Sequence, residues 1–186
     1  PHYLFFTQTD QQRAGPVLQA NPPLRGTEDR AALLEALADG TIDYISTDHA
    51  PHLPGEKASV RPPSGIASIE WFLPLLASLA DRGSISWKRL LQIACENPTR
   101  CFDIPLRNGI KPGNIADIVF ISPAGAYLPD RKIVTRAQVN PYAGFTFTRR
   151  VEAVLVNGAW AYSRRIYINN SSISREAYEQ FQTGHR

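Results

Sequence analysis

Residues 47–52, Thr-Asp-His-Ala-Pro-His, carry the densest chemistry in this chain: one acid and two imidazoles, held by a proline. They follow a short apolar run, Ile42 to Ser46, which predicts a buried strand. A carboxylate at the end of a buried strand is where α/β barrels place catalytic groups. Asp48 could there bind a divalent metal and take a proton from a metal-bound water. The same spacing also suits a turn that Asp48 caps.

The two histidines, His49 and His52, leave more than one interpretation open. Either could bind a metal through a neutral nitrogen, bind an anionic group of a substrate, or only accept a backbone hydrogen bond. One carboxylate with two nearby imidazoles does not complete a hydrolytic zinc site, because zinc takes three or four protein ligands.

Two proline-rich loops hold further candidate binding residues. Residues 62–65, Pro-Pro-Ser-Gly, precede an apolar helical pattern, and helix N-termini offer unpaired N–H groups to anions. Gly65 would let a ligand approach the backbone closely. Asn21, beside a double proline, could bind an amide or carboxylate of a ligand. The alternatives are an ordinary helix entry for Gly65 and a turn for Asn21.

Helical patterns dominate the first half of the chain. A helix is predicted from a cap at Thr27 to a stop at Gly40, with Ala31, Leu34, Leu37 and Ala38 on its apolar face. Further helices are predicted over 66–80 and after a cap at Ser86, and a short turn over 97–102. Residues 1–6 predict a strand and residues 48–65 a loop.

Strand patterns dominate the second half. Residues 116–122 predict a strand, and residues 151–162 predict a hairpin that turns at Asn157-Gly158. A short strand is predicted at 166–168, a loop over 123–148 and a frayed helix or tail at the C-terminus. The change of pattern predicts a domain boundary near residue 105.

Composition excludes several classes of protein. The net charge of +3 comes from scattered basic residues without an aromatic stripe, which argues against nucleic-acid binding. Cys95 and Cys101 form neither a disulfide framework nor a zinc knuckle, and are expected to pack as small hydrophobes in a reducing, cytoplasmic compartment. No signal peptide or apolar membrane span is evident. The chain contains no Met, which suggests that residue 1 is not the natural start.

Taken in order, seven segments resemble dihydroorotases of the amidohydrolase superfamily. Residues 38–52, which end in the Asp-His-Ala-Pro-His signature, carry the strongest likeness. The other segments are Pro1-His2-Tyr3-Leu4, Asn21-Pro22-Pro23-Leu24-Arg25, Pro63-Ser64-Gly65 with Glu70, Asn97-Pro98-Thr99-Arg100, residues 113–119, and Val156-Asn157-Gly158. Each segment alone is weak, but the shared order makes a chance match improbable.

The resemblance implies an α/β fold: residues 1–105 as the C-terminal part of a metal-dependent hydrolase (β/α)8 barrel, and residues 106–186 as a segment of a small β domain with a tail. The implied activity is a cyclic amidase that interconverts N-carbamoyl-L-aspartate and L-dihydroorotate in pyrimidine biosynthesis. Asp48 would bind zinc and shuttle a proton, and Asn21, His52 and Gly65 would bind the substrate. His49 has no implied role.

The family's remaining zinc ligands, for one or two ions, lie upstream of the stretch that Pro1 matches. The chain alone is therefore expected to be inactive. Its implied partners are a small-molecule substrate and either further copies of itself or aspartate carbamoyltransferase, with no nucleic acid and no membrane. Two alternatives stay open: an inactive dihydroorotase-like scaffold, or a related hydantoinase or allantoinase.

Overall fold

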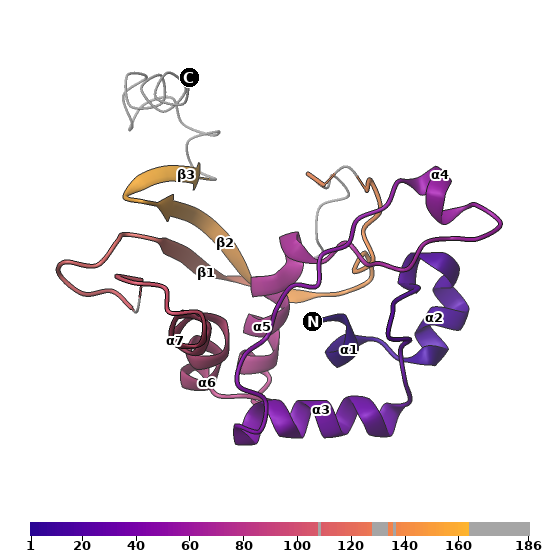
Figure 1. Cartoon of the computed structure of the whole chain (residues 1–186), viewed down its shortest axis with the longest axis horizontal. Coiled ribbons are helices and arrows are strands. Elements are labelled where there is room, and N and C mark those ends of the chain that lie inside the picture. The colour runs from indigo at the N-terminus through magenta and orange to yellow at the C-terminus, as the bar shows by residue number, and fades with distance from the viewer. Residues whose placement is uncertain (108, 128–133, 136, 164–186) are drawn as a thin grey trace.

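A central helix, α5, joins a helical layer to a small antiparallel sheet in the computed structural model (Figure 1). The structure describes residues 1–107, 109–127, 134–135 and 137–163. Its helices are α1 (His2–Phe5), α2 (Gln8–Ala14), η1 (Gly15–Leu18), α3 (Thr27–Asp39), α4 (Pro54–Lys57), η2 (Ile69–Trp71), α5 (Phe72–Asp81), α6 (Trp87–Leu91), η3 (Gln92–Glu96) and α7 (Asn97–Cys101). Its strands are β1 (Ile118–Tyr127), β2 (Phe147–Val156) and β3 (Ala159–Ser163).

Two predicted helices and the hairpin are confirmed. Helix α3 ends at Gly40, as expected, although its N-cap is Gly26 rather than Thr27. Ser86 caps α6 by accepting a hydrogen bond from the backbone of Arg89 (3.0 Å). Strands β2 and β3 pair antiparallel around residues 157–158, and both turn residues have positive φ, as this tight turn requires.

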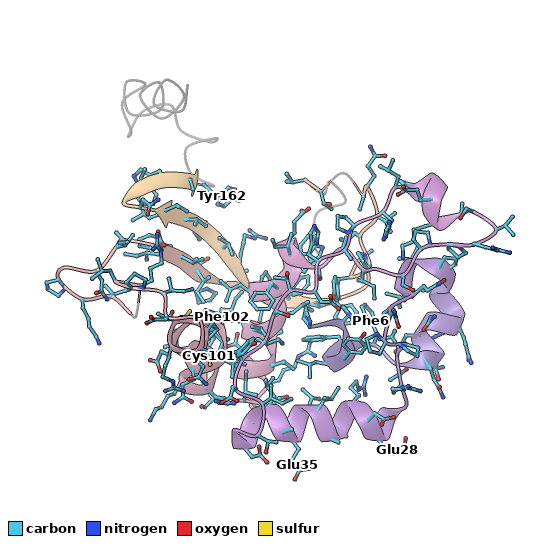
Figure 2. All side chains as sticks on the ribbon, viewed as in Figure 1. Phe6, Glu28, Glu35, Cys101, Phe102 and Tyr162 are labelled. Carbon is cyan, nitrogen blue, oxygen red and sulfur yellow. The ribbon has the colours of Figure 1, made fainter. Side chains whose placement is uncertain are left out.

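Helix α3 is more exposed than its sequence pattern suggested. Leu37 is buried and Leu34 partly so, but Ala31 and Ala38 on the predicted apolar face are exposed. Glu28 and Glu35 point away from the body of the molecule (Figure 2). The helix therefore contacts the core through little more than one turn, at its C-terminal end.

Two apolar clusters hold the helices together. Leu37 packs with residues of α5, α6 and η3, including Leu76, Leu90 and Ile93. A second cluster, with Phe6, Leu75, Tyr142 and Phe147 among its members, joins the N-terminal segment to β2. The sheet is fixed to α5 by a two-pronged pair between Arg149 and Asp81, with N–O distances of 2.8 and 2.9 Å.

Three expectations about the fold were wrong. Residues 1–6 form helix α1 instead of a strand, because local bonds such as Phe6 N–H to the carbonyl of His2 (2.8 Å) satisfy the backbone. Residues 42–46 are extended, but in the described part of the chain they have no neighbouring strand with which to form a ladder. The predicted 123–148 loop is shortened at both ends by β1 and β2.

The expectation for the two cysteines was also wrong: Cys95 and Cys101 are exposed rather than packed. The strand at 166–168 and the C-terminal tail lie outside the described residues. None of the helices in the described part of the chain has the length and hydropathy needed to cross a lipid bilayer.

Candidate active site

The segment that leads into Asp48 is held extended by side chains instead of by a sheet. Arg89, from α6, donates to the carbonyls of Leu37 (2.7 Å) and Ile42. Asn97, buried at the start of α7, donates to the carbonyl of Asp43 at 2.6 Å. The bonds to Ile42 and Asp43 satisfy carbonyl groups that a neighbouring strand would otherwise pair, and the bond to Leu37 ties the same Arg89 to the end of α3; together they fix the path of the chain towards Asp48.

The second half of the same segment is anchored to the start of the helix pair η2–α5. The hydroxyl of Ser68 donates to the carbonyl of Thr47. The N–H of Ala50 donates to the carbonyl of Ile66 at 3.2 Å. Residues 47–50 thus lie against residues 66–68, and the long extended segment is seen rising beside α5 in Figure 1.

Asp48 lies at the exposed end of this segment. Its φ of 45° is in the left-handed region, which non-glycine residues seldom adopt. The carboxylate keeps 58% of its surface exposed, and Oδ2 lies 3.4 Å from Nε2 of the buried His2. The backbone geometry therefore presents a solvent-accessible carboxylate beside an imidazole.

His2 is the residue that sequence reasoning missed. The imidazole is 1% exposed, and neither ring nitrogen has a hydrogen-bond partner among the described residues. Burial lowers the pKa of His2, against the opposing pull of the Asp48 carboxylate, and so favours the neutral ring. The sequence shows only a histidine between a proline and an apolar run at residues 1–6, a pattern that suits a histidine buried for packing just as well.

The two histidines of the signature have separate positions. Nδ1 of His49 accepts hydrogen bonds from the backbone N–H groups of Ser68 (3.0 Å) and Ile69 (3.2 Å). Because that nitrogen is an acceptor, a neutral His49 carries its proton on Nε2. His49 thus anchors the start of η2, which is a structural role.

His52 reaches the loop that precedes η2. Its Nε2 lies 3.1 Å from the carbonyl oxygen of Ser64, and its Nδ1 lies 3.7 Å from a carboxylate oxygen of Glu56. Since a carbonyl can only accept, Nε2 carries a proton there. His52 and Gly65 line one small pocket together with Lys57.

Gly65 is required by close packing. Its φ is +146°, and a Cβ on this residue would lie 2.5 Å from the carbonyl oxygen of Ala50 and 3.0 Å from the ring of His52. The loop and the signature segment therefore touch through backbone atoms at this point.

Asn21 is exposed, on a loop that is tied to both neighbouring parts of the site. The hydroxyl of Tyr3 donates to the carbonyl of Pro22 (2.6 Å), and the N–H of Gly65 donates to the carbonyl of Gln19 (2.8 Å). The structure thus connects the loops of Asn21, Gly65 and His52, although it gives no direct contact between the Asn21 side chain and Asp48.

The described residues supply too few ligands for zinc. No group of three or more histidine, cysteine or acidic side chains in the described part of the chain is placed to hold a metal ion. Asp48 offers one exposed carboxylate, whereas zinc takes three or four protein ligands. The described residues by themselves do not fit a zinc site.

The chain resembles curated proteins named dihydroorotase. It is 41% identical over 128 residues to one from Halobacterium salinarum, a match that covers 68% of this chain and 30% of the relative. It is 37% identical over 168 residues to one from Bacillus thuringiensis, covering 88% and 39%. The chain thus spans between about a third and two fifths of the length of these relatives.

Solved structures agree on the superfamily. D-hydantoinase from Bacillus sp. AR9 matches with a TM-score of 0.80 and 26% identity, over 88% of this chain and 38% of that one. Dihydropyrimidinase from Brevibacillus agri matches with a TM-score of 0.81 and 26% identity, over 89% and 38%. The described mixture of helices and a three-stranded sheet is therefore an α/β arrangement that these enzymes share.

The model of the family described as "Amidohydrolase family" matches residues 6–161, which hold Asp48, both signature histidines and the hairpin. On that match and the fold described above, this chain belongs to the amidohydrolase family.

Proposed function

We propose that the protein to which these residues belong is a dihydroorotase, which interconverts N-carbamoyl-L-aspartate and L-dihydroorotate. The observation that carries the proposal is the exposed Asp48 carboxylate, held at a left-handed backbone position at the end of a braced extended segment. The 37–41% identity to proteins of that name adds the substrate class.

Asp48 is the proposed catalytic group. Its carboxylate accepts the proton of the attacking water and returns it to the amide nitrogen that leaves when the ring opens. It is also proposed as one ligand of a zinc site with one or two ions, whose other ligands are not among the described residues. The neutral imidazole of His2 borders this carboxylate and limits its contact with bulk water on one side.

Asn21, His52 and Gly65 are proposed to bind the substrate. A dihydroorotate ring offers amide groups and one carboxylate. As an imidazolium, with Nε2–H on the Ser64 carbonyl, His52 would donate Nδ1–H to the carboxylate in place of Glu56, whose oxygen now lies 3.7 Å from Nδ1. Asn21 and the backbone around Gly65 would hold the ring amides. Gln19, on the loop of Asn21, joins the two loops: its carbonyl accepts from the N–H of Gly65 and its Nε2 donates to the carbonyl of Pro62.

The test compares Asp48→Asn with a matched control, Asp43→Asn, in the whole protein. Both acids are exposed on the same extended segment, five positions apart. Asp48→Asn should lower kcat by about a hundredfold to ten-thousandfold, as expected for loss of an acid–base group. Asp43→Asn should keep full activity. Equal activity of the two variants would defeat the role of Asp48. The isolated 186 residues should show no turnover and weak zinc binding.

A related hydantoinase is the second candidate, because the structural neighbours carry that name. The lower identity to them, 26%, favours dihydroorotate as substrate. Rates on dihydroorotate, hydantoin and allantoin decide between the three activities, since contacts within the pocket determine which ring substituent is accepted. Turnover of none of them, with the protein folded and zinc present, would support the scaffold alternative.

We also propose the barrel and β-domain division near residue 105, a cytoplasmic location, a role in pyrimidine biosynthesis, and assembly with further copies or with aspartate carbamoyltransferase. The change from helices to strands between Cys101 and Ile118 supports the division. Size measurement of the purified protein, alone and with the transcarbamoylase, tests the assembly.

A further inference from the structure

Lys57 is a buried cation with an unusual set of partners. It is 7% exposed at the end of α4 and lines the same small pocket as His52 and Gly65. Its ammonium donates to the carbonyls of Pro63 (2.9 Å) and Gly65 (2.6 Å). No carboxylate pairs with it in the described part of the chain. A buried ammonium that is costly to desolvate is thus held by backbone carbonyls alone.

The loop 62–65 is fastened at every carbonyl. Gln19 Nε2 donates to the carbonyl of Pro62 (3.0 Å), and Lys57 donates to those of Pro63 and Gly65. The carbonyl of Ser64 lies 3.1 Å from Nε2 of His52. The His52 contact therefore falls on Ser64, between the two carbonyls that Lys57 holds. Movement of either flanking peptide would displace the carbonyl that orients the His52 ring.

We propose that Lys57 is a positioning residue for substrate binding: it fixes the 62–65 loop and, through Ser64, the ring of His52. This inference rests on the proposed function, because it takes His52 and Gly65 as substrate contacts. Lys57 itself need not touch the substrate. It acts on binding because it holds two other groups in the geometry that binding requires.

The test uses Lys57→Met, which keeps the unbranched stem and removes the ammonium. Lys88→Met is the matched control, because Lys88 is exposed on α6. Lys57→Met removes two charge-assisted bonds; since only part of that loss reaches the His52 ring, in the whole protein it should raise KM for dihydroorotate about tenfold and change kcat less than about threefold. Lys57→Arg, which retains the charge and the hydrogen-bond donors, should have a KM close to that of the wild type. A purely structural role would lower the amount of active enzyme without this split.

Backbone hydrogen exchange supplies a readout that does not depend on activity. Residues 62–66 should exchange faster in Lys57→Met than in the wild type or in Lys88→Met. Unchanged exchange there would overturn the clamp, the hold of Lys57 on the 62–65 loop. Faster exchange with an unchanged KM would overturn the link between that hold and substrate binding. A Lys57→Met protein that fails to fold would make Lys57 a requirement of the fold and also overturn the assignment.

The proposed function and the clamp can fail separately. If the wild-type protein does not turn over dihydroorotate, the proposed function fails, while exchange in residues 62–66 still decides whether Lys57 holds the loop.

Gln19→Met gives a second variant on the same loop, since it removes one carbonyl contact and leaves Lys57 in place. It should raise KM less than Lys57→Met does, and a larger rise than that would contradict the central part given to Lys57.

Discussion

Replacing Gly65 with alanine tests the contact between the two loops of the site. The added methyl group would lie 2.5 Å from the carbonyl oxygen of Ala50 and 2.7 Å from its Cβ, distances that the chain cannot keep. The φ of +146° adds backbone strain for any residue with a side chain. Both atoms in conflict belong to the chain that leads from Asp48 to His52, so relief must move one loop against the other.

The size of the effect follows from two independent costs. Strained backbone at such a φ costs about 1–3 kcal/mol. Overpacking against a neighbour that cannot easily move costs about 1–3 kcal/mol more. Gly65→Ala should therefore destabilise the fold by about 2–6 kcal/mol, which lowers Tm by at least about 4 °C in a cooperative unit of about 150–250 residues.

Thermal unfolding of Gly65→Ala, with two control variants, separates these costs. Gly144→Ala has neither a positive φ nor an atom within 4 Å of the new Cβ, and should leave Tm nearly unchanged. Gly40→Ala has a φ of +103° but open space, and should show the backbone cost alone. If Gly65→Ala unfolds at the same temperature as Gly144→Ala, the close approach of the two loops is refuted.

Three further substitutions probe the frame around the site. Tyr142→Phe should leave stability unchanged or raise it by about 1 kcal/mol, measured by urea unfolding, because the buried hydroxyl has no partner among the described residues. Asn97→Ala should cost about 1–3 kcal/mol in the same assay, since it leaves the carbonyl of Asp43 unpaired. Hydrogen bonds from Arg149 lower the pKa of Asp81 from 3.8 to about 2, so this pair stabilises the fold above pH 3.8 and loses that effect as the pH falls towards 2. Between pH 5 and pH 2.5, the Tm of Asp81→Asn should therefore fall less than that of the wild type.

The elements predicted correctly from sequence have signals within a few residues of one another. Gly40 ends α3, Ser86 caps α6, and residues 157–158 turn the hairpin. Each depends on local backbone geometry and on hydrogen bonds within a short stretch. Such features form in the same way whatever the rest of the chain does, and this is why a single sequence predicts them.

The two wrong strand predictions have the opposite cause. A strand exists only when a neighbour pairs with it, and the neighbour is not encoded in the strand's own residues. Residues 42–46 have the right composition and the right extended shape, but their carbonyls go to Arg89 and Asn97. Residues 1–6 have a similar apolar pattern and instead close local bonds in α1.

In the candidate site, too, residues within one segment were predictable, whereas a contact between distant segments was not. The signature segment pointed to Asp48 and His52, but the pairing of Asp48 with His2, 46 residues away, depends on how α1 packs against the helices around it. Nothing near His2 in the sequence distinguishes it from a histidine buried for packing alone.

The support of Asp48 also accounts for a motif that had no role in the chemistry. Asn97 and Arg100 belong to the Asn-Pro-Thr-Arg segment that resembles the family, yet Asn97 is buried and bonded to the carbonyl of Asp43, and Arg100 donates to Asn97 at 3.1 Å. These two residues brace the extended segment five positions before Asp48, the proposed catalytic acid. If Asp48 has that role, the brace matters because a carboxylate transfers protons efficiently only within hydrogen-bond reach of both atoms that it serves.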